Sequence, residues 1–308
     1  MSLGLQLRTE TTPPGVPLTL THQLLAEWFR RECDHVLRGV NLRDEDGVET
    51  LFVELHPAAE DLRLWFENGT EVVVSAQTSS AGPGYHVYVC DLLLSMAGEF
   101  GFRWKADSEE DFDETGYFES RDAGALCKEM LAWLSAVCTS VLDESHDECA
   151  GLLIAMPWGV SYKVDQFLIT AMGPRSRTWT ESVARDPNAG TDFFAWWTPG
   201  FTAEYYLRRA ICLMWNSVRW RPPLTDDERR VLSEVRENLE AAHKLDDSLD
   251  YPWREWSELI GFLHTEADFP SLKEVRDSNA PLIGYRRNPV RVALSGGCGL
   301  APRFETNG

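Results

Sequence analysis

The chain has 308 residues, of which 44% are hydrophobic and 25% are charged; these values are typical of globular proteins and exclude wholesale disorder. Its 29 Lys and Arg residues are outnumbered by 49 Asp and Glu residues, for a net charge of −20, which argues against a nucleic-acid groove because acidic surfaces repel phosphate. No apolar run is long enough to cross a membrane, and the N-terminus lacks a secretory pattern. We therefore expect a cytoplasmic protein without a membrane span.

Most of the negative charge lies in the first half of the sequence. Residues 1–150 contain 28 acidic and 10 basic residues, whereas residues 151–308 contain 21 and 19. The polar segment 143–148 has the composition of a linker or a surface turn. We predict an acidic α+β domain over residues 1–148 and a helix-rich α+β domain over residues 149–308, with one continuous domain as the alternative.

In the first half, residues 1–18 are rich in turn formers, and Thr21 then predicts the N-cap of a helix that runs to about Leu37, with Gly39 as its stop. A hairpin turn is expected at 44–47 because Asp-Gly tolerates the positive φ angles of a tight turn. Strands are predicted over 48–55, 62–66, 72–76 and 100–104, with Asn68-Gly69 as a second hairpin turn. Helices are predicted over 85–96 and 123–142 from their apolar pattern.

In the second half, strands and helices are both expected. The predicted strands cover residues 152–156, 166–172 and 290–294, and the predicted helices cover 202–218, 225–243 and 251–263. The fold class is therefore α+β: a mixed or antiparallel sheet with packed helices in the N-terminal half, and a more helical C-terminal half.

The cysteines favour a reduced protein. There are seven, an odd number, and no two of them form a C-x-x-C pair. Cys90, Cys127, Cys138 and Cys212 lie within apolar runs, so we expect buried thiols rather than disulfides or zinc ligands.

The first candidate site is the loop between the strand at 72–76 and the helix at 85–96. Backbone N–H groups at a helix start favour anions, and His86 offers a proton donor or a ligand. The candidate anion-binding residues are Thr78, Ser79, Ser80, Gly82 and Gly84. Pro83 removes one donor and no Lys or Arg lies between residues 64 and 102, so a tight turn that packs the helix on the sheet is the alternative.

The second candidate site is the acidic segment that follows the predicted strand at 100–104. Residues 111–122 resemble the twelve-residue calcium loop of an EF-hand, with Gly116 at the sixth position, although Asp122 replaces the usual Glu and the helix–loop–helix frame is missing. The candidate calcium ligands are Asp111, Asp113, Thr115, Glu119 and Asp122. We expect no other cofactor.

A basic partner is the competing explanation of the acidic segment. Eight acidic residues lie between positions 107 and 122, and their mutual repulsion is relieved by a cation, by a basic protein surface or by solvent. The 12 tryptophans add an apolar element, because Trp196-Trp197 is hard to hide on one secondary-structure element and is typical of a contact patch or a pocket wall. The candidate partner contacts are Glu109, Glu110, Asp111, Asp113, Glu114, Trp196 and Trp197.

Two functions follow from these patterns. The first is a non-enzymatic cytosolic protein whose acidic half binds a basic protein partner, as an acidic, motif-poor bacterial immunity or toxin-neutralising protein would. The second is an enzyme that uses the loop 78–84 with His86, or a metal-dependent activity at residues 111–122. The sequence contains no H-E-x-x-H, G-x-S-x-G or kinase-type motif, which favours the first function.

Overall fold

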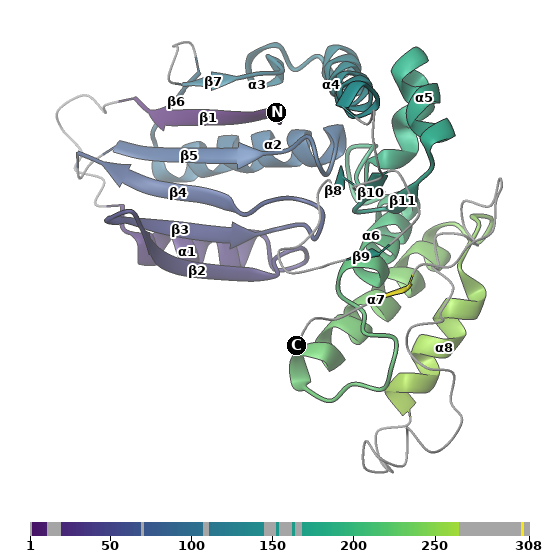
Figure 1. Cartoon of the computed structure of the whole chain (residues 1–308). Helices are drawn as coiled ribbons and strands as arrows, with labels where there is room; N and C mark the ends of the chain where they lie inside the picture. Colours follow the sequence, from purple (N-terminus) through teal and green to yellow (C-terminus); the bar gives the residue numbers. More distant parts are fainter. Residues whose placement is uncertain are drawn as a thin grey trace. The chain divides into compact units, whose positions relative to one another are not determined.

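An antiparallel sheet and several helices give the chain the predicted α+β fold (Figure 1). The computed structural model describes residues 2–10, 20–68, 71–106, 111–144, 152–153, 162–163, 168–264 and 303–304. The chain divides into two units. The first comprises Met1–Cys138 and Val183–Gly200, and the second comprises Thr139–Ser182 and Phe201–Gly308.

The first unit is built on one sheet with the strand order β2-β3-β4-β5-β1-β6, and β7 also pairs with β1. All of these pairs are antiparallel. The strands are β1 (Gly4–Thr9), β2 (Gly39–Glu45), β3 (Val48–Glu54), β4 (Leu62–Glu67), β5 (Glu71–Gln77), β6 (Trp104–Lys105) and β7 (Phe112–Asp113). The strands predicted at 48–55, 62–66 and 72–76 are confirmed as β3, β4 and β5.

Register places an apolar row across this sheet. The row consists of Leu7, Val74, Leu64, Leu51 and Leu42, each paired with the next on the neighbouring strand. Helices α1 (His22–Glu32) and α2 (Pro83–Phe100) lie behind the sheet, on one of its faces (Figure 1). All members of the row are buried except Leu42 on the edge strand β2, whose exposed fraction is 50%.

Gly39 and Gly101 mark two element boundaries that differ from the prediction. Thr21 caps α1 as predicted, since its side chain accepts a hydrogen bond from the Leu24 N–H, but the helix ends at Glu32 and Gly39 instead opens β2. The strand predicted at 100–104 is wrong for most of its length. Helix α2 extends to Phe100, and Gly101 ends it in the left-handed conformation with φ 72°.

Strand β1 was missed by the prediction of a turn-rich segment over residues 1–18. Leu5 and Leu7 alternate with polar residues and are buried in the sheet, which is the period-2 pattern of a strand. Its partners are distant in sequence, since β1 lies between β5 on one side and β6 and β7 on the other. The tight turn predicted at 44–47 is confirmed, because Asp46 and Gly47 both have positive φ.

The first unit has further helices within and after the acidic segment 107–122. They are α3 (Tyr117–Ser120), α4 (Ala123–Glu144), whose residues from Thr139 on belong to the second unit, and the 3-10 helix η1 (Pro187–Phe193). Helix α4 confirms the helix predicted at 123–142. Helix α4 is long and apolar enough to cross a membrane by length and composition alone, and 39% of its most apolar stretch is buried inside the protein. The same properties are common in helices that pack within soluble proteins, so this finding assigns no membrane role.

The second unit is mainly helical among its described residues. Its strands are β8 (Leu152–Leu153), β9 (Tyr162–Lys163), β10 (Leu168–Thr170), β11 (Gly173–Arg175) and β12 (Arg303–Phe304), and its helices are α6 (Ala203–Asn216), α7 (Asp226–Leu245) and α8 (Trp253–His264). Helix α5 (Arg177–Arg185) crosses between the two units. The three predicted helices are confirmed; the strand predicted at 290–294 lies outside the described residues. A buried Arg209 side chain on α6 contacts Glu234 on α7 at 2.8 Å.

Candidate functional site

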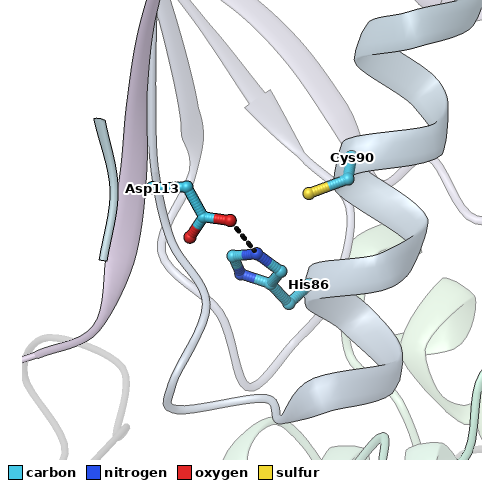
Figure 2. Close-up of side chains that lie close together, drawn as sticks. All are labelled: His86, Cys90 and Asp113. Atoms are coloured by element: carbon cyan, nitrogen blue, oxygen red, sulfur yellow. Dashed lines mark hydrogen bonds and ion pairs between the residues drawn. The ribbon is translucent and has the colours of Figure 1, made fainter. Parts of the chain in front are cut away.

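A buried polar cluster in the first unit brings His86 together with residues from three segments of the chain. His86 lies in the first turns of α2 and is fully buried. Cys90 lies four residues later, so its thiol projects from the same face of the helix. Figure 2 shows both side chains directed toward Asp113 of β7.

The hydrogen bonds of the cluster leave no nitrogen of the imidazole unsatisfied. The Thr78 Oγ1 lies 2.8 Å from His86 Nδ1. On the other side of the ring, His86 Nε2 lies 3.2 Å from Asp113 Oδ2 and 3.1 Å from Thr115 Oγ1. An N–H at Nε2 can donate to Asp113 and Thr115, and Nδ1 lies within hydrogen-bond distance of the Thr78 hydroxyl.

Backbone geometry fixes Asp113 in place. Pairing of Leu5 with Asp113 attaches β7 to β1. The carboxylate then accepts hydrogen bonds from the Thr115 N–H at 2.9 Å and from the Phe118 N–H at 2.7 Å. The chain turns between these two donors at Gly116, whose φ of 66° is in the left-handed region.

Burial and hydrogen bonding shift the ionisation of Asp113 and Cys90 in opposite senses. Burial acts to raise the pKa of Asp113, but the His86 ring and the two backbone N–H groups outweigh it and lower that pKa to about 2. The pKa of the Cys90 thiol is raised by burial. At neutral pH the cluster therefore holds one carboxylate and one protonated thiol.

The predicted anion-binding loop packs against another segment of its own unit. Thr78 contacts His86, and Ser79 Oγ accepts a hydrogen bond from the Leu3 N–H at 3.0 Å. The first-turn N–H of Gly84 donates to the Trp196 carbonyl at 3.0 Å. Gly82 and Gly84 are buried, with the side chains and backbone of residues 194–198 directly over them. Ser80 keeps a buried hydroxyl with no hydrogen-bond partner among the described residues.

The predicted calcium ligands contact different neighbours and do not converge on one site. Asp111 binds Arg8 Nε at 3.2 Å, and Asp122 accepts from the Gly124 and Ala125 N–H groups at the start of α4. Asp113 and Thr115 belong to the polar cluster, and Glu119 is exposed. Of this set, Asp113 is brought into a group that could hold a metal ion, together with His86 and Cys90. The sequence contained one signal for this group, the spacing of four residues between His86 and Cys90.

The predicted partner contacts are divided between the surface and the interior. Glu109 and Glu110 lie outside the described residues, and Asp111 is only 2% exposed. Glu114 is exposed and accepts a hydrogen bond from the Gly4 N–H at 2.7 Å. Trp196 is fully buried and stacks on Tyr88, whereas the neighbouring Trp197 is partly exposed.

A different acidic surface, which sequence reasoning did not select, lies on the β2–β3 hairpin. Every residue from 41 to 49 is exposed. This segment, which we call the acidic hairpin, contains four carboxylates and two exposed aliphatic side chains, Leu42 and Val48. Asp44 pairs directly with Glu49 across the two strands, so two like charges face each other.

Comparison with known proteins assigns this chain to no family. No protein-family model matches the sequence, and neither the curated proteins nor the solved structures include a significant match.

Proposed function

We propose that this protein is a non-enzymatic binding protein whose acidic hairpin engages a basic segment of a partner protein. The single observation that supports this most is the complete exposure of residues 41–49 on the β2–β3 hairpin at the edge of the sheet, with acidic and aliphatic side chains together. The residues that bear the contact are Leu42, Asp44, Glu45, Asp46, Val48 and Glu49.

The apolar part of the surface continues the core of the sheet. Leu42 belongs to the row whose other members are buried, and it pairs with Leu51. An exposed aliphatic side chain at the end of such a row offers a contact that excludes water from neighbouring ion pairs. Among the described residues β2 pairs with β3 alone, so the outer edge of β2 has backbone groups that an extended segment of a partner can pair with.

The opposed carboxylates of the acidic hairpin favour a positively charged partner. On the face that carries Leu42, Asp44 lies opposite Glu49, and His22 Nδ1 is 3.8 Å from Glu49. The repulsion between two opposed carboxylates falls when a lysine or an arginine binds between them. A basic segment with alternating aliphatic residues therefore complements this surface in both charge and pattern.

The alternative function, an enzyme that uses His86 and the loop 78–84, has less support. Thr78, Ser79 and His86 are all at most 1% exposed, and a substrate has to reach the atoms that act on it. We therefore rank partner binding first.

The test compares two variants with the same net charge. The hairpin variant carries Asp44→Asn, Glu45→Gln, Asp46→Asn and Glu49→Gln. The control variant neutralises four exposed acids elsewhere: Glu129, Glu240, Asp247 and Asp250. The probe is a fluorescent peptide of alternating lysine and valine, and a glutamate–valine peptide serves as the negative probe.

We expect the hairpin variant to bind the lysine–valine peptide about thirtyfold more weakly than the wild type, from roughly 0.5 kcal/mol for each of four lost surface pairs. The control variant should stay near wild type, and the wild-type affinity should fall as salt is added. Equal weakening in both variants would mean that bulk charge, not the hairpin, attracts the peptide. That outcome, or the absence of binding to the wild type, overturns the proposal.

A further inference from the structure

We infer that His86, Cys90 and Asp113 form a binding site for a thiophilic divalent cation, with Zn²⁺ as the best match. The ligand atoms of the three residues all lie within 4.8 Å of one another. They come from one turn of α2 and from β7 (Figure 2).

The spacing along α2 is the first argument. Residues four apart lie on the same face of a helix, and metal sites use this spacing to place two ligands side by side. His86 and Cys90 have it, and both are fully buried. Asp113 completes a nitrogen, sulfur and oxygen set, which suits zinc and disfavours magnesium and calcium, since those ions prefer oxygen ligands alone.

The distances are close to those of a tetrahedral centre. Zinc bonds of about 2.0–2.3 Å place neighbouring ligand atoms about 3.5 Å apart. His86 Nε2 is 3.2 Å from Asp113 Oδ2, and the Cys90 sulfur, at most 4.8 Å from the other two ligand atoms, has to approach them by at most about 1.3 Å. Thr115 Oγ1 lies 3.1 Å from His86 Nε2 and donates a hydrogen bond to Asp113 Oδ1, so a fourth ligand would be supplied by this hydroxyl or by water.

The surrounding hydrogen bonds are those that orient metal ligands. Metal-bound histidines use their second ring nitrogen to bind a fixed partner, and Thr78 Oγ1 is that partner at 2.8 Å from Nδ1. The Asp113 carboxylate is held by the Phe118 N–H at 2.7 Å. The positions of both ligands are thus set before a cation binds.

The charges and protons of the three side chains are also consistent with the binding of a divalent cation. A cation with two positive charges, one carboxylate and one thiolate sum to zero, and a buried site tolerates a neutral total best. On binding, the Cys90 thiol releases its proton to solvent as the sulfur–metal bond forms. A metal-bound Nε2 carries no proton, so the ring's remaining N–H is at Nδ1, where the Thr78 hydroxyl oxygen can accept it as a hydrogen bond.

The test uses the full chain, reduced and freed of metal by a chelator, and titrated first with Co²⁺ and then with Zn²⁺. We expect the thiolate-to-cobalt absorption band of a tetrahedral site to appear, and one equivalent of Zn²⁺ to abolish it. Cys90→Ser should lose that band and bind zinc at least about tenfold more weakly. Cys138→Ser is the matched control, since Cys138 is equally buried in the same unit.

Two further measurements keep the inference testable if Cys90→Ser fails to fold. Thr78→Val keeps the ligands and should lower zinc affinity about tenfold through loss of the histidine's hydrogen bond. X-ray absorption of the zinc-loaded wild type should show one sulfur neighbour with the rest nitrogen and oxygen. No cobalt band in the wild type, a band that survives Cys90→Ser, or a zinc shell of several sulfurs would each overturn the assignment.

Discussion

Replacement of Gly84 by alanine should strongly destabilise the first unit, because the second residue of α2 lies directly against another segment. A Cβ at this position would stand 2.8 Å from the Thr198 carbonyl oxygen and 2.9 Å from Trp196 Nε1, and closer still to Trp196 Cδ1. Trp196 cannot move aside cheaply, because its ring is fully buried and stacked on Tyr88 at 5.2 Å.

The magnitude follows from three contributions. Overpacking of a rigid core costs about 3 kcal/mol. Displacement of residues 196–198 also breaks the hydrogen bond from the Gly84 N–H to the Trp196 carbonyl, which contributes about 1 kcal/mol. Alanine recovers up to about 1 kcal/mol of helix propensity. The net loss is about 3 kcal/mol, which corresponds to a fall in Tm of about 6–12 °C for a unit of this size.

The assay is calorimetry combined with urea unfolding followed by tryptophan fluorescence, with Gly98→Ala as the control. Gly98 lies on the same helix, is exposed, and has open space where a Cβ would be. That substitution should stabilise the protein by about 0.5–1 kcal/mol. If the Gly84 and Gly98 variants unfold at the same temperature, residues 194–198 do not pack over the helix start as described.

Two other substitutions test buried charges. Arg8→Met removes the guanidinium whose Nε lies 3.2 Å from the buried Asp111, and we expect a loss of about 3 kcal/mol in urea unfolding that the double variant with Asp111→Leu largely restores; no recovery in the double variant would refute the pairing. Glu255 on α8 has a raised pKa because of burial, and its Oε2 has no partner among the described residues. A raised folded-state pKa adds stability below the ordinary value of 4.5 that is lost as pH rises through the folded-state value. Glu255→Gln should therefore stabilise the protein by about 1 kcal/mol at pH 7 and have little effect at pH 4, and an equal effect at both pH values would contradict this.

The local elements were predictable because their signals are local. The turn at Asp46-Gly47 and the cap at Thr21 depend on residues within one turn of the chain, and the structure has both. The short apolar runs of β3 and β5 and the alternation at the start of β4 likewise indicate strands without knowledge of their partners. The fold class follows from these elements together.

The polar cluster could not be assembled in this way. His86 was identified as a candidate from its place at a helix start, and Asp113 from its place in an acidic loop, but nothing in the sequence joined the two. They meet because β7 pairs with β1, and β1 was overlooked since a short strand next to a Pro-rich segment carries a weak signal. Pairing over a hundred residues of chain is a property of the whole sheet, so it cannot be read from local pattern.

The structure also separates acids that look equivalent in the sequence. Asp111 and Asp113 have partners, Arg8 and His86, that hold them in the interior, so their charges contribute to the fold. Asp44 and Glu49 lie opposite each other on an exposed hairpin, where Asp44 also accepts a hydrogen bond from the Gly47 N–H, and opposed like charges of this kind destabilise the free hairpin. A bound cationic side chain removes that cost and adds its own attraction. Under the proposed function, a basic partner would gain from this opposition of like charges in addition to the attraction of the net charge.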